Sequence, residues 1–283
     1  MQGIASLYLG NDWLLYVDSS GRYEASEMVA PCLLLAQPGG ELDVRAGDGR
    51  GLRSTALLHA PNLVSREDTA LHGAAFLYLD PLSDAGHAVA GGCAREGLRP
   101  WALPAACDWS PRWFDLLVNG TADRDDVARW VARAQQALGV TGREGTRVDR
   151  RLHTVAHAVA ADAAGRLSIA QLANQVHWSD EHLRKVFREC VGVTLSRYQM
   201  WCRIHRMLSS SCGAASGMRT ALEDAGFYDL PHGHRALRRY FGLTPGATLQ
   251  PAIRRADCRA SAARDGRASS PFRTSPVEAS LLR

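Results

Sequence analysis

Long polar and basic side chains occupy one face of a predicted helix in the C-terminal half of the chain. Apolar residues recur there at positions i, i+3, i+4 and i+7, as Leu183, Val186, Phe187 and Cys190, which is the spacing of a buried helix face. Guanidinium and ammonium groups on the opposite face can donate to guanine O6 and N7 in the major groove of DNA. The outward residues are Glu181, His182, Arg184, Lys185 and Arg188, and Lys185 is the only lysine in the chain.

A second helix of the same character is predicted from Leu230 to Phe241. Asp229 precedes it and is suited to cap its first turn, and Gly242 follows it as a terminator. Its outward residues include His234, Arg235, Arg238 and Arg239.

The elements around the first basic helix predict a helix-turn-helix. Ser168-Ile-Ala-Gln171 has the pattern of a capping box that opens a short helix. A break follows at His177-Trp178, Ser179 is a second N-cap, and Gly192 is suited to end the second helix. Two short helices joined by a tight turn form a helix-turn-helix, although an ordinary helical hairpin with a solvated face would show the same pattern.

The arrangement recurs further along the chain. A short amphipathic helix is predicted from Met218 to Ala225, and Gly226-Phe227 forms the turn before the second basic helix. Between the two units, a helix from about Ser196 to Leu208 is expected to bury Tyr198 and Trp201. The two units are therefore predicted at residues 168–190 and 217–241.

Residues 148–250 resemble the DNA-binding domain of the AraC/XylS family of bacterial transcription regulators. The ordered string Gly-Phe-x-Asp followed by Phe-Gly-x-Thr-Pro carries much of the resemblance. The matching residues are Leu172, Ala173, Ser179, Leu183, Phe187, Gly192, Thr194, Tyr198, Arg203, Gly226, Phe227, Asp229, Arg235, Phe241, Gly242, Thr244 and Pro245.

The resemblance implies two units that enter successive major-groove segments on one face of double-stranded DNA and influence RNA polymerase. It assigns base-reading positions in both units, and the remaining basic residues are expected to contact phosphates or solvent. The base-reading candidates are Glu181, Arg184 and Lys185 in the first unit, and Leu230, Pro231, His234 and Arg235 in the second; the phosphate candidates are His182, Arg188, Arg238 and Arg239.

Two residues and one linking segment depart from the family pattern. Gly233 and Leu237 stand where aromatic residues are usual, and the link from Ser209 to Gly217 is longer than usual. We therefore expect a looser second unit that contributes less binding energy, and we expect Gly233→Phe to raise the melting temperature.

The N-terminal residues 1–105 are predicted to be β-rich, because short apolar or alternating runs are separated by Gly, Pro and Asp turns. The segments Leu57–Asn62 and Ala74–Pro81 resemble, more faintly, the cupin-like sensor domain of many AraC/XylS members. Residues 1–147 contain no His-x-His pair, so no metal and no cofactor are predicted. The candidate ligands, interpreted instead as surface or core residues, are Glu24, Glu27, His59, His72 and His87.

The complete prediction is a multidomain α+β chain. A cupin-like sensor or dimerisation barrel (1–105) precedes a helical linker region (106–146), an all-α DNA-binding domain with two helix-turn-helix motifs (147–250) and a disordered basic tail (251–283). The tail is expected to be disordered because its Arg, Ala and Ser residues bury little apolar surface.

Composition and charge agree with this division. The 283 residues are 46% hydrophobic, enough for a sizeable core. Residues 1–147 contain 13 Arg and 18 acids (net −5), whereas residues 148–249 contain 13 Arg plus Lys and 8 acids (net +5). The second segment is expected to meet a polyanion.

The chain is expected to be cytoplasmic, without membrane association. No apolar run is long enough to span a bilayer, and the N-terminus has no secretory pattern. Seven scattered cysteines without Cys-x-x-Cys spacing favour reduced thiols.

The leading hypothesis is a non-enzymatic transcription regulator controlled by a small-molecule effector at the N-terminal domain, with a homodimer as the candidate assembly. No set of polar residues identifies the effector. Two alternatives remain: a cupin-type enzyme with an appended DNA-binding domain, and a ligand-independent regulator whose N-terminal domain only dimerises.

Overall fold

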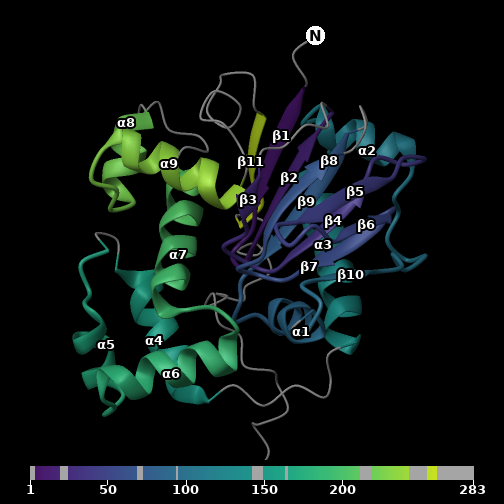
Figure 1. The fold of residues 1–283 in the computed structure, drawn as a ribbon. Helices are drawn as coiled ribbons and strands as arrows, with labels where there is room; N and C mark the ends of the chain where they lie inside the picture. The colour runs from purple at the N-terminus through teal and green to yellow at the C-terminus, as the bar shows by residue number, and fades with distance from the viewer. Residues whose placement is uncertain are drawn as a thin grey trace, which may run out of the picture.

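The computed structural model describes residues 4–19, 25–68, 73–93, 95–141, 149–162, 165–210, 218–241 and 254–259. A strand-rich N-terminal part lies beside a helical C-terminal part (Figure 1). The prediction of a β-rich N-terminal domain followed by an all-α domain is therefore confirmed.

A seven-stranded sheet forms the centre of the N-terminal part, in the order β10-β7-β4-β9-β2-β1-β11. Its neighbours run antiparallel, except that β1 and β11 are parallel. Central strands such as Cys32-Leu-Leu-Leu-Ala36 are buried on both faces and therefore read as continuous apolar runs. The strands are β1 (Ala5–Leu9), β2 (Trp13–Asp18), β4 (Cys32–Ala36), β7 (Ala56–His59), β9 (Ala74–Leu79), β10 (Leu98–Pro100) and β11 (Arg254–Asp257).

A smaller sheet lies against one face of the large one, in the order β3-β8-β5-β6. In β5 the side chains alternate, so Leu42 and Val44 are buried whereas Arg45 is exposed. Leu42 and Val44 share a core with Leu34 and Phe76 of the large sheet. The strands are β3 (Ser26–Glu27), β5 (Leu42–Ala46), β6 (Gly51–Ser54) and β8 (Val64–Asp68).

Three helices cover the opposite face of the large sheet: α1 (Asp84–Gly92), α2 (Pro111–Val118) and α3 (Arg124–Thr141). Val131 of α3 packs in one core with Leu15 and Leu77 of the sheet. The hydroxyl of Tyr8 on β1 donates to the carbonyl oxygen of Leu117 at 2.8 Å. The helices predicted as a linker region are thus integrated into the core of the N-terminal part.

The C-terminal part contains six helices within the residues described. A short helix precedes each basic helix, and a longer one connects the two pairs. The helices are α4 (Arg150–Ala161), α5 (Ile169–Gln175), α6 (Asp180–Val191), α7 (Leu195–Ser210), α8 (Met218–Asp224) and α9 (Leu230–Phe241).

The start of the predicted disordered tail is ordered instead, which corrects that prediction for residues 254–259. Strand β11 pairs with β1, with Ser6 opposite Arg254 and Leu9 opposite Asp257, and Cys258 is buried. Backbone pairing along a sheet edge needs no large apolar side chains, so composition alone did not reveal this strand. Residues 260–283 lie outside the described residues.

The two parts of the chain share an extensive interface. Asn62 Nδ2 donates to the carbonyl oxygen of Gly192, after α6, at 2.9 Å. The ring of Tyr78 on β9 lies 4.6 Å from that of Phe241 at the end of α9. Both helix-turn-helix units therefore contact the N-terminal part. No helix among the described residues is long and apolar enough to cross a membrane.

Candidate nucleic-acid interface

The first basic helix is held by well-formed caps. Ser168 and Gln171 form the predicted capping box at the start of α5. The Ser179 side chain accepts a hydrogen bond from the backbone nitrogen of His182 at the start of α6. Gly192 ends α6 with a φ of 77°, a left-handed conformation that favours glycine. Each cap satisfies a helix-end group that has no partner within the helix.

The turn between α5 and α6 is fixed by an aromatic side chain. His177 has a φ of 55°, so the chain reverses sharply there. Trp178 follows, and the Arg151 guanidinium of α4 lies 4.3 Å from its ring centre. The edge-on ring of His182 lies 4.8 Å from Trp178. These contacts connect the turn to α4 and α6.

The inner face of α6 is buried and its outer face is exposed, as its sequence pattern requires. Leu183, Phe187 and Val191 have no accessible surface, and the Phe187 ring lies 5.5 Å from that of Tyr198 on α7. The structure places all five predicted DNA-contacting residues of this helix on its exposed side: Glu181, His182, Arg184, Lys185 and Arg188.

The second unit has the same plan. Asp229 Oδ1 accepts a hydrogen bond from the backbone nitrogen of His232 at 2.6 Å, in the first turn of α9. Leu237 and Phe241 are buried. Among the predicted contact residues, Pro231, Arg235, Arg238 and Arg239 are exposed and His234 is half-buried. The side chain of Leu230, another of the candidates, lies outside the structural description.

Gly233 packs against the side chain of Leu222 on α8, which overturns the expectation that an added aromatic ring would stabilise this unit. A Cβ atom placed on Gly233 would lie 2.2 Å from Leu222 Cδ2 and 3.3 Å from Leu222 Cγ. The Leu222 side chain of α8 therefore fills the space beside this glycine, and a phenylalanine would collide with it. The sequence pattern could not show this contact. In the family pattern an aromatic ring at this position fills the space, whereas in this chain Leu222 from the preceding helix fills it.

One basic residue of α9 is engaged by the N-terminal part. Arg239 Nη2 donates to Glu27 Oε2 on β3 at 3.1 Å, and Arg197 of α7 pairs with the other oxygen of the same carboxylate. This three-residue cluster was not predicted, because its members are far apart in the sequence and Glu27 was considered only as a possible metal ligand.

The other histidines and acids considered as metal ligands do not converge. His59 is fully buried, with its ring nitrogens 2.7 Å from Ala60 O and 2.6 Å from Ser65 Oγ; burial lowers its pKa to about 4. His87 is half-buried on α1, and Glu24 and His72 lie outside the described residues. No group of three or more His, Cys, Asp or Glu residues among those described could hold a metal ion.

A family model described as a helix-turn-helix domain matches residues 172–251. This match begins within α5, so it covers the first unit except the start of that helix, and it covers the whole second unit. No curated protein sequence is similar enough to the chain to count as a relative.

Solved structures of the ToxT protein from Vibrio cholerae are similar over most of the chain. Apo ToxT carrying a point substitution has a TM-score of 0.54 at 10% identity, covering 84% of this chain and 97% of that one. Wild-type ToxT bound to an unsaturated fatty acid also has a TM-score of 0.54 at 10% identity, covering 86% and 97%. ToxT bound to a naphthalenyl-butenoic acid has a TM-score of 0.53 at 9% identity, covering 87% and 97%. At this identity, the similarity establishes a shared two-domain fold.

Proposed function

We propose that this chain, a DNA-binding transcription regulator with an AraC-type helix-turn-helix domain, reads its operator mainly through α6. The observation that carries the proposal is the exposed face of α6 within the segment matched as a helix-turn-helix domain. The core behind this face fixes the helix, so its long side chains are presented from a rigid base.

The chemistry of the exposed residues suggests separate roles. Arg184 and Lys185 would donate to guanine in the major groove, and Glu181 would accept from cytosine. His182 and Arg188 would contact phosphates and position the helix. In α9, we assign base contacts to Pro231, His234 and Arg235, with Leu230 at its first position, and phosphate contacts to Arg238.

We further infer that a small-molecule effector controls the regulator. Two of the ToxT structures with this fold contain an organic acid, and this supports effector binding by a similar two-domain protein. The interface between the parts offers a route from effector to DNA, because Asn62 and Glu27 contact the two helix-turn-helix units. We propose a cytoplasmic, non-enzymatic regulator that acts as a homodimer and contacts RNA polymerase.

Binding of the full chain to genomic DNA fragments, measured over a range of salt concentrations, tests the proposal. Phosphate contacts release counterions, so the logarithm of the binding constant should fall with the logarithm of salt by about 0.9 per contact. Sequencing the retained fragments should yield a common motif. Retention without a motif, or affinity independent of salt, would count against a sequence-specific regulator.

A matched pair of variants identifies the reading helix. Arg184→Ala should weaken operator binding by about 1–3 kcal/mol. Arg112→Ala removes an equally exposed arginine from α2, on the N-terminal part, and should leave the affinity within about 0.5 kcal/mol. Equal losses in the two variants would show that α6 is not the reading helix.

A further inference from the structure

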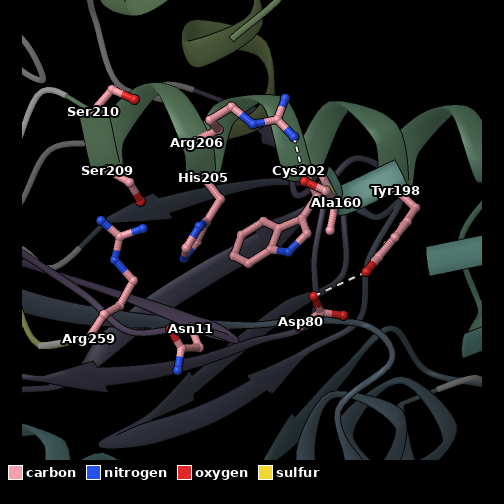
Figure 2. Close-up of a pocket in the computed structure, with 11 residues that line it drawn as sticks. Asn11, Asp80, Ala160, Tyr198, Cys202, His205, Arg206, Ser209, Ser210 and Arg259 are labelled. Carbon is pink, nitrogen blue, oxygen red and sulfur yellow. Dashed lines mark hydrogen bonds between the residues drawn. The ribbon is translucent and has the colours of Figure 1, made fainter. Parts of the chain in front are cut away.

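A cavity of about 320 Å³ lies between the large sheet and α7, the helix that connects the two helix-turn-helix units. Its walls come from Asn11 in the β1–β2 turn, Asp80 directly after β9, the helices α4 and α7, and Arg259, two residues after the end of β11 (Figure 2). The volume is within the usual range for a small-molecule site. A molecule bound there would touch both parts of the chain.

One end of the cavity is acidic. Asp80 is 8% exposed, and its oxygens accept hydrogen bonds from the Leu82 backbone nitrogen at 2.8 Å and the Tyr198 hydroxyl at 3.3 Å. Burial and the nearby Asp12 carboxylate raise the pKa of Asp80 to about 7. A positively charged group beside Asp80 would relieve the cost of ionising it there.

The other end of the cavity offers a hydroxyl and a guanidinium. Ser209 is 7% exposed, and its buried Oγ has no hydrogen-bond partner in the structure. Arg259 lies at the same end (Figure 2), and its Nε and Nη2 are oriented by Asp257 at 2.9 and 2.7 Å. A buried hydroxyl without a partner costs stability, and an acidic group of a ligand would accept its hydrogen bond.

Three residues of α7 line the stretch between these two ends: Trp201, His205 and Arg206. Arg206 Nη2 donates to the carbonyl oxygen of Ala160 on α4 at 2.7 Å (Figure 2), so its guanidinium is held toward α4. Burial lowers the pKa of His205 to about 4, so the imidazole is neutral at physiological pH. Tyr198 and Ser209 are eleven positions apart on α7, which corresponds to about 16 Å along a helix axis. The cavity therefore presents an acidic end at Asp80 and a hydroxyl and guanidinium at the other end, with Arg206 held toward α4 between them.

We propose that this cavity binds a small zwitterion, with its ammonium group on Asp80 and its acidic group toward Ser209 and Arg259. This inference rests on the proposed function, because it identifies the class of effector that the regulator would sense. A ligand seated along α7 would set the position of that helix on the sheet, and α7 carries a helix-turn-helix unit at each end.

Calorimetry on the full-length protein, without DNA, tests the proposal. The probes are the ω-amino acids from 4-aminobutyrate to 10-aminodecanoate, each compared with the carboxylic acid and the amine of the same chain length. At about pH 8, where Asp80 is ionised, at least one ω-amino acid should bind about 10- to 100-fold more tightly than either analogue, because each end gains a charge-assisted hydrogen bond.

Two variants test which end of the cavity binds the ammonium group and which binds the acidic group. Asp80→Asn keeps the side-chain shape and should reduce the affinity for the zwitterion to that for the carboxylic acid, whereas Ser209→Ala should reduce the preference for the acidic group. Near pH 7 the wild type should release protons on binding, because the ammonium group favours ionised Asp80, and Asp80→Asn should release none. Glu41→Gln, at an exposed residue directly before β5, should bind like the wild type.

Binding of none of the ω-amino acids, equal binding of the carboxylic acids, or unchanged proton release in Asp80→Asn would overturn the inference. These outcomes are separate from failure of the proposed function. A protein that binds its operator but no zwitterion would refute only the ligand class, whereas absence of specific DNA binding would refute the regulator.

Discussion

Glu27 Oε2 accepts two hydrogen bonds from Arg239, from Nη2 at 3.1 Å and from Nε at 3.3 Å. Glu27 lies on β3 of the N-terminal part and Arg239 lies on the second basic helix. Arg197 of α7 shares the same carboxylate. In this arrangement the N-terminal part holds the second helix-turn-helix unit through a group that would otherwise be available to a DNA phosphate.

We expect Glu27→Gln to lower the free energy of unfolding by about 1–3 kcal/mol. The loss should come mainly from Arg197, because its side chain is only 16% exposed and would be left without a counter-charge. Arg239 should contribute less, because its side chain is 63% exposed and water screens its ion pair. Denaturant unfolding measures the change. Glu41→Gln, which removes an exposed carboxylate, should stay within about 0.5 kcal/mol of the wild type, and equal stability of the two variants would contradict the argument.

Asp80→Asn should stabilise the protein in alkaline solution. The pKa of Asp80 is raised from 3.8 to about 7 in the folded chain, so the stability supplied by its protonated form is complete below about pH 4 and is lost as the pH rises through 7. Asparagine mimics the protonated carboxyl at every pH. The advantage should reach at most about 4 kcal/mol above pH 7 and shrink as the pH falls toward 4. A pH-independent difference between variant and wild type would rule out this origin.

Substitutions on α6 should separate base contacts from phosphate contacts. Arg184→Ala and Lys185→Ala should each cost about 1–3 kcal/mol on the operator and relax discrimination at one base pair. Arg188→Ala should weaken specific and random DNA alike and reduce the salt slope by about one contact. Titrations of each variant against operator and scrambled duplexes measure the two affinities and their dependence on salt. The same losses on both duplexes for all three variants would disprove the assignment.

The first unit is still expected to contribute more binding energy than the second. The packing at Gly233 no longer supports this prediction. It now rests on the contact between Glu27 and Arg239, because α9 would have to break this contact before Arg239 could bind DNA. Arg184→Ala should therefore weaken operator binding more than Arg235→Ala, although both arginines are exposed. A larger loss in the second variant would reverse the ranking.

Gly233→Phe should destabilise the protein rather than raise its melting temperature. The added ring would displace Leu222, and overpacking of this kind typically costs about 1–3 kcal/mol. Gly139 on α3 is a matched control, because a Cβ atom there would meet no atom within 4 Å. Gly139→Ala should gain up to about 1 kcal/mol from helix propensity. Thermal unfolding of both variants measures the two effects, and an increase in melting temperature for Gly233→Phe would mean that the Leu222 side chain can move aside at no cost.

Local signals in the sequence were sufficient for the recognition elements but not for the contacts between distant segments. Ser168, Ser179 and Gly192 act within one or two turns of their own helices, so their caps were predictable and are confirmed. Helix α1 was missed because it is short and contains three glycines. The cavity residue Asp80 and the Glu27 cluster depend on tertiary packing between residues more than 100 positions apart, which no local pattern encodes.

Because β11 pairs with β1, the helices α4 to α9 are an insertion in the sequence between strands of the same sheet. The chain leaves the N-terminal part after α3 and rejoins it at β11, so two tethers limit how far the helical part can swing away. In the intact chain, such a connection keeps the effective concentration of each part near the other high. A single backbone cut between α3 and α4 removes the covalent link but leaves the β1–β11 pairing and the interface between the parts. The two fragments should therefore elute together as a noncovalent complex under native conditions and separate only in denaturant.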